Sequence, residues 1–234
     1  MKRVYKSVGI AETADGYAVE LDGRPIRTPD GRAVIVPTRS LATLIASEWA
    51  AQGAEVKPAT MPATQHAVTV LDRVTPRREA VIEEIAAYGA TDLLCYRAAE
   101  PPELVNRQDH LWQPYLDWAR EALGAELTVS HSIMPTMQSG ASQAALAAAV
   151  RDENDLALGP LHRAVALSGS LVLPLAVLHG HATMGEMTAA ALVEDRHQLE
   201  TWGHDDLAAQ RLNSLEAELR TIDAFWRALG RIGT

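Results

Sequence analysis

The chain has few of the residues that carry covalent or metal chemistry: among 234 residues it has one cysteine, Cys95. A single cysteine excludes an intrachain disulfide and a cysteine-based zinc cluster, and such usage is typical of a reducing compartment. Basic residues are also few, because 21 Lys and Arg stand against 30 Asp and Glu, which gives a formal net charge of −9. This acidic balance argues against nonspecific nucleic-acid binding.

Long apolar runs are missing as well. The most apolar stretch, residues 164–178, contains Gly169 and Pro174 and is shorter than the roughly 20 residues of a bilayer-spanning helix, so we expect a buried core segment and no membrane span. Residues 1–6 lead into no apolar signal segment and no Arg/Ser-rich transit segment. We therefore expect a protein of the bacterial cytoplasm, or of the mitochondrial matrix if a transit peptide has already been removed.

Alanine dominates the 47% apolar content, which favours close-packed helices, but the first 37 residues have a different pattern. Short alternating runs are separated there by Asp15-Gly16, Asp22-Gly23 and Asp30-Gly31. Asp-Gly between alternating runs predicts tight hairpins, since both central residues of the favoured turn need positive φ. Residues 1–40 also carry seven basic and five acidic groups, whereas the remainder carries 14 and 25. The sequence predicts a small antiparallel β unit before an acidic body.

Helical periodicity begins after this unit. Thr38 is a candidate N-cap and Gly53 a candidate C-cap of the first helix, and a proline-spaced link follows. Later helices are predicted over residues 76–89, 103–123, 143–152, 160–178 with a break near Gly169 or Pro174, 186–202 and 206–229, with a strand or extended connection at 126–130. The predicted class is α+β: a β-rich domain at 1–72 with one or two helices, then an all-helical domain at 73–234.

Catalytic motifs are missing from the chain. It contains neither G-x-x-x-x-G-K-S/T nor G-x-G-x-x-G, the two glycine-rich phosphate-binding motifs, so we expect no bound nucleotide. It also lacks G-x-S-x-G, so we expect no serine nucleophile of that type. Cys95 lies between Leu94 and Tyr96, a setting typical of an inert buried thiol. Adjacent carboxylates such as Glu83 and Glu84 point about 100° apart on a helix, as solvated faces do.

Histidines leave two interpretations open. His179, His181 and His204, with Asp205 and Asp206, could supply ligands to a metal-dependent hydrolase, although their spacing matches no H-E-x-x-H pattern. Alternatively, these imidazoles lie at helix C-termini and in turns, where the helix dipole favours them. A stoichiometric transition metal in protein purified without a histidine tag would favour the hydrolase.

The five tryptophans divide into two groups. Spacing on their helices predicts a core position for Trp49, Trp112, Trp118 and Trp226. Trp202 precedes a glycine and then acidic residues, so two interpretations stay open: it anchors its helix in the core, or it lies on an exposed corner beside carboxylates, as aromatics of protein interfaces do.

Many segments together resemble one family, the assembly chaperones of the F-type ATP synthase that act on the α subunit of its catalytic head. They follow in order over nearly the whole chain: residues 2–6, 21–29, 47–52, Met61-Pro62 with Thr64, 72–74, Tyr88 with 91–97, Gln108 with 112–114 and Trp118, and Gln198 with Trp202-Gly203. Where the family has Asp-Glu, an aromatic residue and Gln, this chain has Glu194-Asp195-Arg196-His197-Gln198. The charge is kept and His197 replaces the aromatic.

The resemblance implies a β-rich N-terminal domain, an all-helical C-terminal domain, no enzymatic activity and no nucleotide. It implies that the chain binds newly made α subunit and prevents its aggregation until it meets β. A scaffold without a fixed client is a further alternative, which the ability to keep α subunit soluble would distinguish.

A chaperone needs a displayed surface with some apolar area and a charged rim, and no convergent catalytic groups. We therefore expect a monomer with no catalytic residue, no metal and no cofactor, whose acidic body assists encounter with a basic client. Trp49 and Gly203 are expected to be structural. The expected client-binding residues are Glu194, Asp195, Gln198, Trp202, Asp205 and Asp206.

Overall fold

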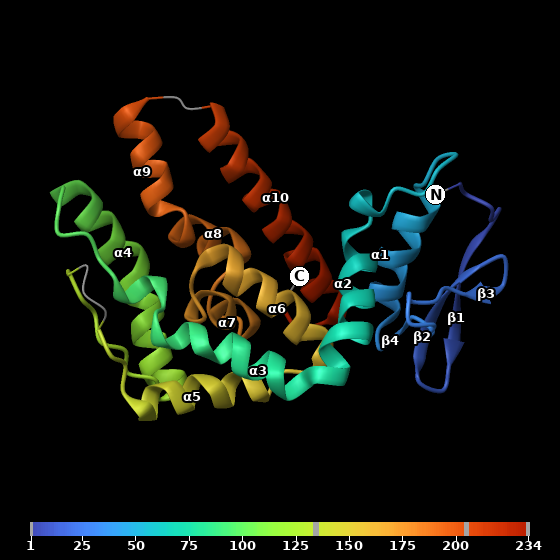
Figure 1. Ribbon diagram of the computed structural model, residues 1–234, viewed down its shortest axis with the longest axis horizontal. Helices are drawn as coiled ribbons and strands as arrows, with labels where there is room; N and C mark the ends of the chain where they lie inside the picture. The colour runs from blue at the N-terminus through green and yellow to red at the C-terminus, as the bar shows by residue number, and fades with distance from the viewer. Residues whose placement is uncertain (1, 133–135, 204–205, 233–234) are drawn as a thin grey trace. The chain divides into compact units, whose positions relative to one another are not determined.

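The computed structural model describes residues 2–132, 136–203 and 206–232, apart from the side chain of Trp202. The chain forms two compact units (Figure 1). The sheet unit comprises residues 1–78, 155–160 and 221–234, and the helical unit comprises residues 79–154 and 161–220. The predicted α+β class is confirmed, because a small antiparallel sheet near the N-terminus precedes a mostly helical remainder. The predicted domain boundary after residue 72 stays a prediction.

Strand β2 is the centre of the sheet. β1 (Val8–Thr13) pairs antiparallel with β2 (Gly16–Leu21), and β3 (Arg24–Pro25) and β4 (Ile35–Val36) pair antiparallel with different parts of β2. Asp22 and Gly23 form the second turn with φ of 50° and 76°, the positive values that this turn requires. In the first hairpin Thr13 pairs with Gly16, so the turn residues are Ala14 and Asp15, one position earlier than the sequence pattern predicted.

Helix α1 (Arg39–Ala50) begins as predicted, because the Thr38 hydroxyl accepts a hydrogen bond from the Leu41 N–H at 3.2 Å. The helix ends earlier than Gly53, however, and the predicted glycine C-cap is wrong. Ala51 is the C-cap and keeps right-handed helical angles, with φ of −72°, so the chain leaves this helix without a left-handed residue.

The sheet unit contains a second helix, whose range the sequence pattern did not predict. α2 (Pro62–Thr69) begins where the proline-spaced link at residues 57–62 ends; it follows a 3-10 turn (Pro58–Thr60) and continues into a π-helical turn (Val70–Val74) and a 3-10 turn (Thr75–Arg77). Pro62 is the first helical residue, where proline is well tolerated. The cap comes from α1, since the Glu48 carboxylate accepts hydrogen bonds from the N–H groups of Ala63 and Thr64 at 2.7 and 2.8 Å.

Trp49 lies half-buried at the end of α1. Its ring meets the edge of the Tyr5 ring at a centroid distance of 5.7 Å, and the Tyr5 hydroxyl donates to the Trp49 carbonyl at 2.7 Å. Tyr5 belongs to a small core cluster with Val56 and Met61, against which Trp49 packs. Among the described residues, the buried Trp49 Nε1–H has no hydrogen-bond partner. Trp49 therefore contributes apolar packing between α1 and the N-terminal segment.

Late segments of the chain complete the sheet unit. Trp226 is fully buried and its Nε1–H donates to the Ala157 carbonyl at 3.4 Å. The Thr38 hydroxyl, besides capping α1, donates to the Ala228 carbonyl at 2.6 Å. Gly159 has no room for a side chain, because an added Cβ would lie 2.5 Å from a methyl carbon of Val70. Residues about 70 to 190 positions apart in sequence are thus packed into one core.

The helical unit follows the predicted order of helices, and the differences concern their bounds. Its elements include α3 (Arg78–Ala86), α4 (Pro102–Trp118) with a π-helical turn (Ala119–Leu123), α5 (Gly140–Arg151), α6 (Asp155–Ser168), α7 (Val172–Leu178), α8 (Met184–Ala191), α9 (Val193–Trp202) and α10 (Asp206–Leu229). Helices α6 and α10 have residues in both units, and α3 has its first residue, Arg78, in the sheet unit. No helix among the described residues is long and apolar enough to cross a membrane.

The helix predicted from residue 160 begins earlier, at Asp155, and contains Pro160 in its interior. The helix predicted over 186–202 is two helices, because Leu192 leaves helical angles with φ of −104° and ψ of 12° and is itself buried. Among the described residues, the 126–130 segment forms one isolated bridge, between Ser130 and Tyr96, so of the two predicted alternatives it is the extended connection. The break predicted near Gly169 or Pro174 is at Gly169, where φ is +70°.

Asp92 is a fully buried carboxylate in the helical unit. One of its oxygens accepts from the Leu94 N–H at 3.1 Å, and the other accepts from the N–H groups of Leu171 and Val172 at 2.7 and 3.0 Å. Burial raises the pKa of Asp92, against the opposing effect of these hydrogen bonds. The carboxylate satisfies the free N–H groups at the start of α7 and ties them to residues 92–95.

We expect Trp49→Arg to destabilise the sheet unit by about 2–4 kcal/mol, because a charged group would replace a large apolar contact with Tyr5. Trp49→Phe is the matched control and should cost less than about 1.5 kcal/mol, since the indole N–H makes no hydrogen bond that would be lost. Soluble yield and urea unfolding measure both. A soluble Trp49→Arg variant with an unchanged unfolding midpoint would contradict this role.

Asp92→Ala should lower the free energy of unfolding by about 2–4 kcal/mol, because the N–H groups of Leu171 and Val172 would stay buried without an acceptor. Asp152, an exposed carboxylate at the end of α5, provides the control. Asp152→Ala should change stability by no more than about 0.5 kcal/mol. Equal effects of the two substitutions in urea unfolding would show that the Asp92 hydrogen bonds do not stabilise the unit.

Candidate functional site

Helix α9 carries most of the predicted client-binding residues, and side chains of α4 and α10 hold it. Arg107 of α4 pairs with Glu200 of α9 at 2.6 Å, and Arg196 of α9 pairs with Glu216 of α10 at 2.8 Å. These ion pairs are partly or largely exposed, so each contributes little to stability. They join α9 to α4 and to α10. We call Arg107, Glu194, Asp195, Gln198 and Glu200, together with the buried Gln108 that contacts Glu194, the α4–α9 surface.

Glu194 is the acid of this surface that a buried side chain contacts. Its Oε1 accepts a hydrogen bond from Gln108 Nε2 at 2.5 Å, and Gln108 is fully buried. The other end of the Gln108 amide accepts from the Ala98 N–H at 2.8 Å, which fixes the amide orientation. Burial raises the pKa of Glu194, and the neighbouring Asp195 carboxylate raises this pKa further, whereas the Gln108 hydrogen bond lowers it. Glu194 is thus a half-buried carboxylate held in one position.

The other predicted residues of α9 lie around Glu194. Gln198 is one helical turn further on, so the two residues share a face, and Gln198 is exposed. Asp195 is half-exposed and points about 100° away around the helix. The structure therefore brings two carboxylates and one amide to adjacent positions on α9, where they can contact a partner.

The rest of the predicted set is only partly described. Asp206 begins α10 and is exposed. His204 and Asp205, and the side chain of Trp202, lie outside the described residues. Gly203 ends α9 with φ of +91° and ψ of 178°, a combination that is open essentially only to glycine.

Arg107 and Gln108 were not among the client-binding residues predicted from the sequence. A signal was present for Gln108, because it lies four and seven positions before Trp112 and Tyr115, on the apolar stripe of its helix. A polar side chain on a buried stripe needs a partner. The sequence does not reveal that this partner is Glu194, 86 residues later.

A small hollow lies next to this surface along α4. It has a volume of about 290 Å³, and α4 and α8 line it together with the loop that precedes α8. Its lining residues are His110, Leu111, Pro114, Tyr115, His181, Ala182, Glu186 and Ala189. Apolar area with a charged rim is common at protein interfaces.

The histidines of the alternative hydrolase have structural contacts. The N–H groups of Gly180 and His181 donate to the carbonyls of Val177 and Ala176 at 3.0 and 2.9 Å, which caps the C-terminus of α7. The His181 ring stacks on Trp118 at 5.4 Å. His179 Nε2 lies 3.8 Å from a carboxylate oxygen of Glu153. Within the described ranges, no three His, Cys, Asp or Glu side chains gather as metal ligands would.

The single thiol, that of Cys95, is also in an unreactive setting. Cys95 is fully buried, and burial, reinforced by the charge of Asp92, raises its pKa to about 12. The nucleophile in thiol chemistry is the thiolate, which such a pKa suppresses at neutral pH.

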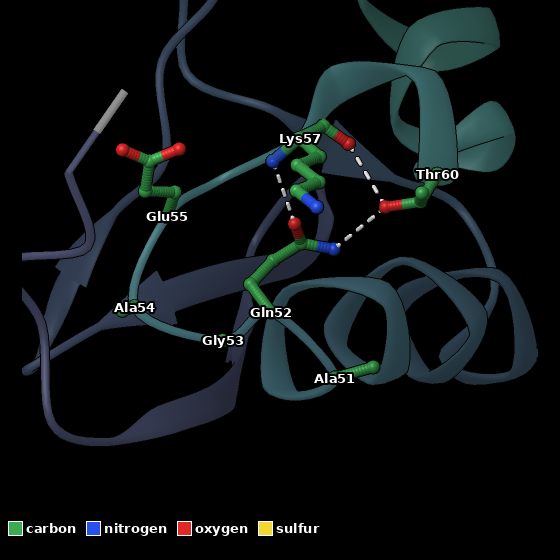
Figure 2. A pocket seen from close by; sticks show the side chains of 7 residues that line it. All are labelled: Ala51, Gln52, Gly53, Ala54, Glu55, Lys57 and Thr60. Atoms are coloured by element: carbon green, nitrogen blue, oxygen red, sulfur yellow. Dashed lines mark hydrogen bonds between the residues drawn. The ribbon is translucent and has the colours of Figure 1, made fainter.

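A larger pocket of about 520 Å³ lies in the sheet unit, beyond the end of α1 (Figure 2). The Gln52 side chain forms part of its wall and is almost fully buried. Its Nε2 donates to Thr60 Oγ1 at 3.1 Å and to the Glu48 carbonyl at 2.9 Å, while its Oε1 accepts from the Lys57 N–H at 2.7 Å. These three hydrogen bonds join residues around the pocket to one another. The Gln52 side-chain amide therefore holds the 52–60 loop in place, and its donor and acceptor groups are already used.

Comparison with known proteins gives consistent results. The family model described as "ATP12 chaperone protein" matches residues 2–120. "Protein atp12, mitochondrial" of Schizosaccharomyces pombe is 22% identical over 214 residues, which cover 86% of this chain and 74% of that protein. The crystal structure of Atp12 from Paracoccus denitrificans superimposes with a TM-score of 0.93 at 37% identity, over 97% of this chain and 98% of that chain. The Atu1473 protein of Agrobacterium tumefaciens gives 0.91 at 36% identity, over 97% and 86%.

Glu194→Gln should make the protein more stable at neutral pH. A carboxyl whose pKa is raised on folding stabilises the folded state fully below its unfolded pKa, and this contribution is lost as pH rises through the folded pKa. Glutamine keeps an acceptor for Gln108 and carries no charge. We therefore expect a higher unfolding midpoint for Glu194→Gln at pH 7 and no gain at pH 3. A lower midpoint at pH 7 would show that the charged form is favoured by folding.

Proposed function

This chain belongs to the ATP12 chaperone family, whose members act in ATP synthase assembly, and we propose that it binds the unassembled α subunit of the catalytic head. In this role it prevents aggregation of the α subunit until that subunit pairs with β. The observation that supports the proposal most strongly is the family membership, with 37% identity to a solved Atp12 over nearly the whole chain.

The α4–α9 surface is our proposed client-binding site. It combines the fixed carboxylate of Glu194 with the adjacent Asp195, and an apolar hollow follows along α4. The net charge of −9 favours encounter with a basic client surface and opposes self-association. A partly desolvated carboxylate can gain a cationic partner from the client, which would offset the unfavourable burial that raises its pKa.

We propose that this work is binding without catalysis, by a monomer that needs no nucleotide or metal. Family membership supports this proposal, and the one thiol of the chain is buried and protonated. A bacterial cytoplasmic location is our further proposal. It is consistent with solved relatives from Paracoccus and Agrobacterium, while the Schizosaccharomyces relative is named as mitochondrial.

Charge reversal tests the site. Asp195→Lys, alone and combined with Glu194→Lys, should weaken binding of purified α subunit by about tenfold or more, because like charges would then face a basic client surface. Asp195→Lys alone is easier to interpret than the double variant, because Glu194→Lys also removes the acceptor of the hydrogen bond from Gln108. Suppression of α-subunit aggregation and direct binding at two salt concentrations are the measurements.

Glu83→Lys is the matched control. Glu83 is an exposed carboxylate of α3, so this variant changes the net charge equally at another place. It should bind α subunit within about twofold of the unmodified chain. Equal losses for Asp195→Lys and Glu83→Lys would mean that only net charge matters, and unchanged binding by the double variant would remove α9 from the site.

A further inference from the structure

Strand β1 has one paired edge and one open edge. We propose that the open edge of β1 binds an extended, basic segment of the client as an added β-strand. This inference rests on the proposed function, because the partner is the same client, but it concerns a different surface from α9.

The register shows which backbone groups face outward. Antiparallel pairs alternate between hydrogen-bonded and non-hydrogen-bonded pairs. The Asp22 N–H donates to the Ser7 carbonyl at 3.1 Å, so Asp22 and every second residue before it on β2 face β1. The pairing of Gly9 with Glu20 and of Ala11 with Ala18 continues this series. The N–H and carbonyl groups that point away from β2 are therefore those of Val8, Ile10 and Glu12.

These outward groups are unoccupied. β1 pairs with β2 alone, and within residues 2–132, 136–203 and 206–232 the backbones of Val8, Ile10 and Glu12 have no hydrogen-bond partner on this side. Three consecutive outward positions, each with a donor and an acceptor, match the repeat of one incoming strand.

The edge also lacks the usual protection. Natural edge strands are commonly shortened, bulged, or supplied with lysine or proline, which prevents pairing with other chains. The β1 sequence, VGIAET, contains neither lysine nor proline, and its six residues pair with β2 in an unbroken register without a bulge. The side of β1 is thus a regular template for another strand.

Charge indicates what kind of segment fits. Residues 8–21, which form the hairpin, carry Glu12, Asp15 and Glu20 and no basic residue. This hairpin is an acidic island within a front part that is otherwise rich in Lys and Arg. An extended segment with apolar residues and at least one Lys or Arg near Glu12 complements it.

A second copy of this chain is a poorer occupant. All charged side chains of the hairpin, residues 8–21, are carboxylates. Two such hairpins placed edge to edge would therefore repel each other. The strand is also short, about 20 Å long, so the strip it buries lies far below the roughly 800 Å² per partner of a stable interface. A client that is also held elsewhere on the chaperone needs no such area, because the second contact is intramolecular.

Amide-resolved hydrogen exchange tests the proposal on the full chain with purified cognate α subunit. In the free chaperone the amides of Gly9, Ala11 and Thr13 should be protected and those of Val8, Ile10 and Glu12 should exchange fast. On complex formation the three fast amides should slow by at least about tenfold, because they then donate to the client.

The other outcomes overturn the inference. A complex that forms with the three amides still exchanging fast removes this edge while leaving the proposed function intact. Slow exchange in the chaperone alone that grows with its own concentration would identify a second copy as the occupant. Failure to form any complex with α subunit would overturn both proposals.

A pair of variants at one position tests the backbone contact. Glu12→Pro removes one outward N–H, and proline is tolerated on an edge strand when its nitrogen faces solvent. Glu12→Ala keeps the N–H and removes only the charge. We expect α-subunit binding to weaken roughly fivefold for Glu12→Pro and at most about twofold for Glu12→Ala. Equal affinities of a folded Glu12→Pro variant and Glu12→Ala would overturn the proposal, and if Glu12→Pro fails to fold, exchange on the unmodified chain decides.

Discussion

The helical unit depends on the buried carboxylate of Asp92. This side chain accepts hydrogen bonds from the start of α7, and all seven residues of α7 are buried. Helices α4, α5 and α8 contact α7. A short helix has little stability of its own, because the first turn is entropically costly and its terminal N–H groups need acceptors. The Asp92 carboxylate supplies those acceptors and thereby holds α7 in place, and the surrounding helices pack on α7.

Two acidic side chains of the helical unit differ in how far burial leaves them open to a partner. Asp92 is fully buried, and backbone N–H groups donate to both of its oxygens. Glu194 is half-buried, and Gln108 alone donates to it among the described residues. Burial raises the pKa of both. The carboxylate of Glu194 therefore retains capacity for a partner, as interaction sites do when they accept a cost in stability.

Local signals in the sequence predicted many elements well. Thr38 was identified as the α1 cap because its hydroxyl acts three residues away, and Asp22-Gly23 as a tight turn because both residues adopt positive φ. The predicted range of the last helix, 206–229, matches α10. The range of helix α2 was not predicted because its cap is the Glu48 side chain, 15 residues earlier. The break at Leu192 was missed because it has neither glycine nor proline.

The candidate site likewise combines local features that the sequence predicts with long-range contacts that it does not. The sequence by itself determined the α+β class and the helical segment that carries Glu194 and Asp195, because turns, caps and periodicity act over a few residues. The family resemblance came separately, from matching segments in order along the chain. Only the tertiary structure decided that Gln108 holds Glu194, that Asp92 holds the start of α7, and that β1 keeps an open edge. The two hydrogen-bonded contacts join residues far apart in the chain, and the open edge of β1 depends on which strand pairs with it. The free energy of such contacts depends on burial that no local pattern encodes.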